Sequence, residues 1–132
     1  MNENFKPAGY SSVSPYFVID GAEKFIHLMR EIFNATELRK YKRPDGKIAH
    51  AELQIDDSVI MFCDSTERFP PLPIMIHVYL PNVDETFSKA VNAGCEVIEE
   101  PKVNEGDPDK RGSFKDFGGN MWSISTQVND NK

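Results

Sequence analysis

Two stretches of this chain, VSPYFVID at residues 13–20 and HVYLPNVD at residues 77–84, share one pattern. Each is a short apolar run that ends in aspartate and leads into a segment whose apolar residues recur at helical spacing. Each half then closes with a hairpin signal, IDDS at residues 55–58 and FGGN at residues 117–120. The pattern predicts two copies of one strand–helix–strands module, and paired modules of this kind usually enclose a ligand.

Length and composition narrow the class of protein. The 132 residues suit one domain over residues 1–132, with module one at about 11–66 and module two at about 73–128. No apolar run is long enough to cross a bilayer, and the polar N-terminal sequence favours a cytoplasmic protein. The formal net charge of -6 argues against nucleic acid and against a membrane surface as partners. The two cysteines, Cys63 and Cys95, are predicted to be reduced, buried thiols in apolar strands.

The pattern of apolar residues predicts an α+β fold with two helices and eight strands. We expect helices at about 21–33 and 84–93, and strands at about 13–19, 37–42, 48–55, 59–63, 74–80, 95–99, 112–116 and 121–127. Asp20 is predicted to cap the first helix, and Gly94 to follow the end of the second. Residues 102–111 are charged and rich in turn formers, so we expect a long loop that acts as a lid or a disordered tip.

Strand alternation predicts which side chains share a face in module one. A two-residue turn at residues 56–57 places His50 opposite Cys63 and Glu52 opposite Met61. These four side chains then lie on the face that the helix does not cover.

The same rule, applied to a turn at residues 117–120, predicts the faces of module two. Trp122 is expected under the helix, while Met121 and Ser123 share the other face with Phe114 and Asp116. The predicted pocket lining collects the mixed polar and apolar side chains of these second faces: Met61, Cys63, Met75, His77, Tyr79, Phe114, Met121 and Ser123.

Three segments in this order resemble one known family. They are DGAEKFIHLMREIFNA at residues 20–35, PDGKIAHAELQIDDSVIMFCD at residues 44–64 and KDFGGNMWSIST at residues 115–126. Together they resemble the vicinal oxygen chelate superfamily of glyoxalase I, bleomycin-resistance and fosfomycin-resistance proteins and extradiol dioxygenases. The resemblance covers about residues 11–127 and implies tandem βαβββ modules that form a curled mixed sheet around a cleft.

The resemblance also implies where a divalent metal would be held, by His or Gln on the first strand and Glu on the last strand of each module. The matching positions in this chain are Val13 and Met61 in module one, and His77 and Ser123 in module two. Valine, methionine and serine are poor ligands for a hard divalent cation. We therefore expect no metal and no other cofactor.

The remaining polar residues on the second face have two readings. His50 and Glu52 lie two apart on one strand, so they could form an acid–base pair or a displaced ligand set. Polar alternation on the solvent side of a strand explains them equally well. His77 is predicted to be a hydrogen-bonded pocket histidine without a metal, and Cys63 lacks an adjacent cation that would activate it as a nucleophile.

These observations predict metal-independent binding of a small organic molecule, neutral or cationic because of the negative net charge. The alternative is a glyoxalase- or dioxygenase-like lyase or oxidoreductase with a shifted metal or acid–base site at His50, Glu52 and His77. The residues leave open whether the protein is an enzyme. The resemblance further implies a homodimer.

Overall fold

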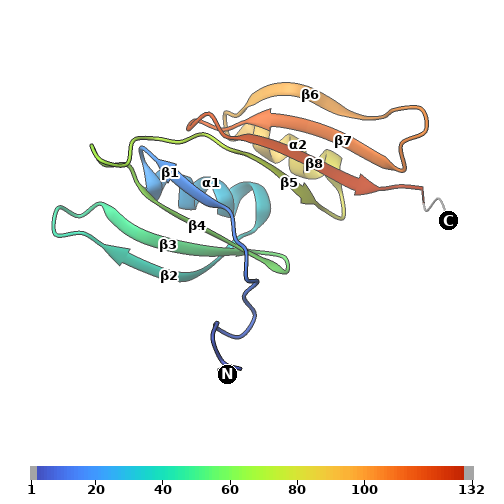
Figure 1. The fold of residues 1–132 in the computed structure, drawn as a ribbon. Coiled ribbons are helices and arrows are strands. Elements are labelled where there is room, and N and C mark those ends of the chain that lie inside the picture. Colours follow the sequence, from blue (N-terminus) through green and yellow to red (C-terminus); the bar gives the residue numbers. More distant parts are fainter. Residues whose placement is uncertain (1–2, 130–132) are drawn as a thin grey trace. The chain divides into compact units, whose positions relative to one another are not determined.

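Each half of the chain folds as one βαβββ module (Figure 1). The structure, a computed structural model, describes residues 3–129. Within it, contacts group residues 3–30 and 34–72 as unit 1, and residues 31–33 and 73–129 as unit 2. The predicted α+β fold of tandem modules is confirmed.

Unit 1 contains a four-stranded mixed sheet in the order β1-β4-β3-β2, in which β1 pairs with β4 in parallel and the other pairs are antiparallel. Its elements are β1 (Tyr16–Ile19), α1 (Ala22–Phe33), β2 (Thr36–Lys42), β3 (Ile48–Ile55) and β4 (Ser58–Asp64), except that the last three residues of α1 group with unit 2.

Unit 2 repeats this topology in the order β5-β8-β7-β6, with β5 parallel to β8. Its elements are β5 (Met75–Tyr79), α2 (Val83–Asn92), β6 (Glu96–Val103), β7 (Asp109–Lys115) and β8 (Met121–Gln127).

Aromatic rings form the core on the helix-covered face of each sheet. In unit 1 the ring centroid of Phe25 on α1 lies 5.1 Å from that of Phe17 and 4.9 Å from that of Phe62. In unit 2 the ring of Phe33 lies 4.9 Å from Trp122, whose Nε1 donates to Asp116 Oδ2 at 2.9 Å. All of these except Phe33 and Asp116 are fully buried. The opposite face of each sheet is left for the polar and sulfur-containing side chains, as alternation requires.

The prediction that Asp20 caps α1 is wrong. Gly21 occupies the N-cap at φ 106°, a conformation that favours glycine. Glycine has no side-chain atom that could accept a capping hydrogen bond. Asp64, at the end of β4, accepts instead from the backbone N–H groups of Gly21 at 3.1 Å and Ala22 at 2.8 Å through Oδ1. Its Oδ2 accepts from Ile48 N–H at 2.7 Å, so one buried carboxylate joins three segments of unit 1.

The ends of α2 follow the sequence more closely. Asn82 is the N-cap and its side chain accepts from Glu85 N–H at 3.1 Å. Gly94 follows the helix at φ 96° and donates to Val91 O at 3.0 Å, which confirms its predicted position. Asp84, in contrast, lies inside the helix and is therefore not equivalent to Asp20.

The predicted long loop over residues 102–111 is wrong, because half of it belongs to strands. Lys102 pairs with Arg111 and Val103 with Lys110, so the connection shortens to residues 104–108. β6 is an edge strand, where Pro101 and charged residues are tolerated. Gly112 permits this close pairing, since a Cβ there would lie 3.0 Å from Pro101 Cγ.

Two smaller findings complete the fold. Both cysteines are free and half-buried, and burial raises the pKa of Cys95 to about 11. Cys95 lies in the turn before β6 and not in a strand. Among the described residues, neither helix has the length and hydropathy needed to span a membrane.

The Asp64 cap predicts a defined effect on stability. Asp64→Ala should lower the free energy of unfolding by about 1–3 kcal/mol, because it leaves buried N–H donors without an acceptor. Asp64→Asn, the matched control, keeps one acceptor oxygen and should cost less. Burial raises the pKa of the Asp64 carboxyl, but three backbone hydrogen bonds outweigh this and hold its pKa below the ordinary value.

The Asp64 contribution is therefore present above the ordinary aspartate pKa and is lost as pH falls through the lowered folded value. Urea unfolding of the three proteins at neutral and acid pH measures both effects. Equal stability of Asp64→Ala and the unaltered protein at neutral pH would contradict this assignment.

Candidate functional site

The open face of unit 1 carries a buried carboxylate, Glu52 on β3, whose residue is only 3% exposed. Its Oε1 accepts from the Tyr10 hydroxyl at 2.5 Å and lies 3.6 Å from Arg39 Nε. Its Oε2 lies 2.7 Å from His50 Nε2. Burial raises the pKa of Glu52, but the hydrogen bonds from Tyr10 and His50 outweigh it and hold the pKa below its ordinary value. The group is therefore a carboxylate at neutral pH.

The hydrogen-bond chain continues from His50 to β1. His50 Nδ1 lies 3.1 Å from the Tyr16 hydroxyl, and Tyr41 on β2 stacks on the imidazole at 6.5 Å between ring centroids. Burial raises the pKa of Tyr16 to about 12, with the neighbouring Cys63 thiol adding to the shift. Glu52, His50 and Tyr16 are thus joined end to end across β3 and β1.

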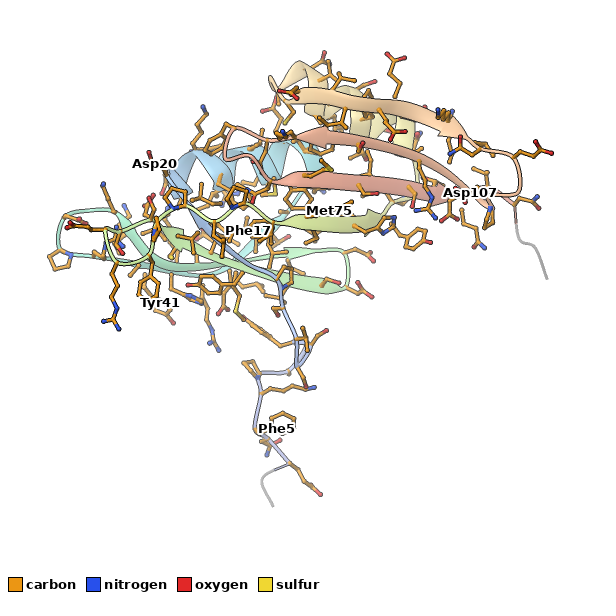
Figure 2. All side chains as sticks on the ribbon, turned by 45° about the horizontal axis from the view of Figure 1, so that its top comes forward. Phe5, Phe17, Asp20, Tyr41, Met75 and Asp107 are labelled. Carbon is orange, nitrogen blue, oxygen red and sulfur yellow. The ribbon has the colours of Figure 1, made fainter. Side chains whose placement is uncertain are left out.

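Sequence reasoning missed Tyr10 and Tyr16. Tyr16 could have been found, because alternation along β1 places it on the face opposite the buried Phe17. No sequence signal pointed to Tyr10, which lies 42 residues from Glu52 in an arm outside the strands. The N-terminal arm runs away from the sheet of unit 1 toward Phe5 (Figure 2).

Unit 2 has a pocket of about 420 Å³ on its open face. Its lining combines sulfur and aliphatic side chains, two hydroxyls, an amide and opposite charges: Met75, Ile98, Glu99, Asn104, Arg111, Gly112, Ser113, Met121 and Ser123. Ser113 and Ser123 pair directly across β7 and β8. Met75, labelled on β5 in Figure 2, is 70% exposed and lies beside Met121 in the parallel ladder.

A second polar network lies beside this pocket. Arg111 donates to Asp107 Oδ2 at 2.8 Å and to Asp109 Oδ2 at 3.0 Å, and Tyr79 donates to the same Asp109 oxygen at 2.7 Å. The bond to Asp109 raises the pKa of Tyr79. The Arg111 charge is therefore matched by two carboxylates.

His77 belongs to this part of unit 2. Its Nε2 lies 2.8 Å from Ser125 Oγ, and its ring meets Tyr79 edge-on at 4.6 Å between centroids. Burial, followed by the nearby Arg111 charge, lowers the pKa of His77, so the imidazole is neutral at neutral pH. It is engaged by a hydroxyl partner, in the way a hydrogen-bonded histidine is expected to be.

Strand pairing corrects one of the positions assigned to the family's metal ligands. His77 pairs with Ser123 in unit 2, and the residue that pairs with Met61 in the same way is Tyr16. Val13 lies outside β1 and is 86% exposed, so its assignment was wrong. The error arose because Asp20 precedes α1 whereas Asp84 lies inside α2. Among residues 3–129, no three His, Cys, Asp or Glu side chains gather closely enough to hold a metal ion.

The prediction that Phe114 and Asp116 share a face with Met121 and Ser123 is also wrong. Lys115 pairs with Met121, so Phe114 lies opposite Trp122, is fully buried and stacks on the indole at 6.4 Å. Asp116 belongs to the turn, where its carboxylate accepts from backbone and side-chain N–H groups of Asn120. The turn is one residue longer than predicted, and a slip of one residue transfers every side chain to the other face.

The structure thus brings the predicted residues together in two groups. His50, Glu52, Met61 and Cys63 share the open face of unit 1, with the predicted β3–β4 pairing confirmed. Met75, Met121 and Ser123 line the pocket of unit 2, and His77 and Tyr79 lie on the same strand as Met75.

Comparison with known proteins identifies relatives of the whole chain. A profile of the Glyoxalase/Bleomycin resistance protein/Dioxygenase superfamily matches residues 15–124. Uncharacterized protein Mb0911c of Mycobacterium bovis is 31% identical over 141 residues, which cover 98% of this chain and 90% of the relative.

Solved structures share the fold at lower sequence identity. TioX from Micromonospora sp. ML1 superposes with a TM-score of 0.71 at 17% identity, over 87% of this chain and 95% of that chain. The fosfomycin resistance protein FosX from Listeria monocytogenes superposes with a TM-score of 0.64 at 15% identity, over 88% of this chain and 92% of that chain. These likenesses show the fold alone.

Proposed function

This chain belongs to the Glyoxalase/Bleomycin resistance protein/Dioxygenase superfamily, and we propose that it binds a small organic molecule without the family's usual divalent metal. One observation carries the proposal. The strand ladders place His77 beside Ser123 and Tyr16 beside Met61 at the positions that correspond to the family's ligands. A single imidazole without a carboxylate is a weak set of ligands for a divalent cation.

The pocket of unit 2 is the proposed binding site. Met75, Met121 and Ile98 supply apolar contacts, and the hydroxyls of Ser113 and Ser123 supply hydrogen bonds that can orient a ligand. Tyr79 and His77 lie on β5 next to this surface and are proposed to extend it.

Charge supports a neutral or cationic ligand. The positive charge of Arg111 is matched by Asp107 and Asp109, and Glu99 adds a further carboxylate to the lining. The chain as a whole carries a formal net charge of -6. An anionic ligand would meet repulsion from both sources.

An enzymatic function is the second candidate, and one observation favours it. The 2.7 Å contact between His50 and Glu52 is the geometry of an oriented acid–base pair. A metal-dependent form of this function would require a bound ion, which the following measurement detects.

We predict that the purified protein holds no stoichiometric divalent metal. Elemental analysis after mild purification should find less than one ion per chain. Titration with zinc, nickel, manganese and iron(II), followed by thermal unfolding, should give no saturable shift, because a ligand that binds the folded state stabilises it. One tightly held ion per chain would refute the metal-free proposal.

We predict that Ser123→Phe blocks ligand binding and leaves the protein folded, because Ser123 faces the pocket. A ligand identified by a thermal-shift screen, titrated by calorimetry, provides the assay. Trp122→Ala is the matched control on the adjacent, fully buried position, and should cost about 3–5 kcal/mol of stability as a large core truncation does. Unaltered affinity in a folded Ser123→Phe protein would exclude this pocket as the site.

We propose a symmetric homodimer, as the family resemblance implies. Light scattering should give a mass of twice the 15.0 kDa of one chain. A mass of one chain at every concentration would show that the protein is a monomer.

A further inference from the structure

On the open face of unit 1, a chain of hydrogen bonds leads from the buried Glu52 carboxylate to the surface. Tyr10 and Arg39 already provide Glu52 with a donor and a positive charge. His50 Nε2 makes a third contact with Glu52, and His50 Nδ1 lies within hydrogen-bonding distance of the Tyr16 hydroxyl. The Tyr16 residue is 41% exposed, so this end of the chain reaches the surface.

We propose that Glu52, His50 and Tyr16 form a proton relay whose outer end, the Tyr16 hydroxyl, exchanges a proton with a carbon acid or hydroxyl group of a small molecule. This activity goes beyond the proposed binding function, and it does not depend on the pocket of unit 2.

The direction of each hydrogen bond follows from the carboxylate at the inner end. An ionised Glu52 can only accept, so Nε2 of neutral His50 must carry the hydrogen. Nδ1 then has a free lone pair, and the Tyr16 hydroxyl donates to it across 3.1 Å. The carboxylate therefore holds His50 in the tautomer in which it can accept a proton from Tyr16.

Proton transfer through this chain is balanced. A C–H or O–H bond of the small molecule breaks, its electron pair stays on the small molecule, and its proton moves to Tyr16 Oη. The proton of Tyr16 moves at the same time to His50 Nδ1. The imidazolium that forms lies 2.7 Å from the Glu52 carboxylate, which stabilises it. The reverse steps return the proton to the product or to water.

The raised pKa of Tyr16 argues against a standing phenolate and is consistent with a relay. Burial raises the pKa of Tyr16 to about 12, so at neutral pH only a minute fraction of the free hydroxyl would be ionised. In the relay Tyr16 gains one proton as it loses another and never carries a charge. The imidazole is held in place by Tyr41, stacked at 6.5 Å, and by the tilted ring of Tyr16 at 5.7 Å.

The other titratable or charged groups on this face come from each element packed around His50. They are Tyr10 of the arm, Arg39 and Tyr41 of β2, and Cys63 of β4. Arg39 is the one permanent charge in this list, and it lies against Glu52, where it favours the ionised carboxylate.

The test uses the full chain and 5-nitrobenzisoxazole, a planar carbon acid. Removal of its C3 proton breaks the N–O bond and releases a coloured phenolate, so the reaction can be followed by absorbance. The unaltered protein should accelerate this reaction above the buffer rate. Tyr16→Phe and His50→Gln should each lower kcat/KM about 100-fold, within the usual contribution of a positioned acid or base. The exposed His27→Gln on α1 is the matched control and should have no effect.

The pH profile separates a relay from a purely structural role. In a relay, Tyr16→Phe and His50→Gln should change the pH dependence of kcat/KM and not only its size, because each substitution breaks the path of the proton. A protein no faster than buffer, or a Tyr16→Phe protein as fast as the unaltered one, would overturn the proposal.

A second measurement does not depend on turnover. Long-range ¹H–¹⁵N correlation spectra, assigned with His50→Gln, should show neutral His50 protonated at Nε2 and unprotonated at Nδ1. The Nδ1-protonated tautomer would overturn the relay, since Tyr16 could then donate nothing to His50.

Discussion

The parallel pairing of the first and last strand of each module is the constraint on which the rest of the site depends. In unit 1 it places Tyr16 beside Met61, and in unit 2 it places His77 beside Ser123. Because side chains alternate along a strand, this pairing also sends Phe17 and Trp122 into the cores under the helices. The identity of the open face is thus decided by the same register that builds the hydrophobic core, and neither can change without the other.

Buried carboxylates organise this framework from within. Asp64 holds the start of α1 and β3, Asp116 holds the β7–β8 turn and the Trp122 indole, and Glu52 holds the arm and His50. Burial of a carboxylate is unfavourable unless several donors compensate. Among the described residues, every buried side-chain nitrogen or oxygen atom has a hydrogen-bond partner. The carboxylates of Glu52 and Asp64 keep a pKa below the ordinary value for this reason.

Much of the fold could be predicted because local signals and burial agree. The β3–β4 hairpin follows from a two-residue turn, with Asp56 at φ 52°, and its register placed His50 and Glu52 on the open face correctly. Failures arose where one residue of register or a distant partner decides. Phe114 lies on the face opposite to the predicted one, because the turn between β7 and β8 is one residue longer than the pattern suggested.

The missed parts of the site have the same origin. The start of α1 donates to Asp64 and not to Asp20, although Asp64 lies more than forty residues further along the chain. Tyr10 donates to Glu52 over a similar separation in sequence. Residues 102–103, at the end of β6, looked like part of a loop because an edge strand accepts charged residues. Local pattern carries no information about such partners, so these features emerge only when the chain is folded.

Metal-free ligand binding is tested most directly by a crystal structure of the protein with a ligand from the thermal-shift screen, with anomalous diffraction collected for transition metals. We expect ligand density in contact with Met75, Met121 and Ser123, and no anomalous peak at the site. His77 should lie within hydrogen-bonding distance of Ser125 or of the ligand. An anomalous peak at His77, coordinated jointly by protein and ligand oxygens, would contradict it.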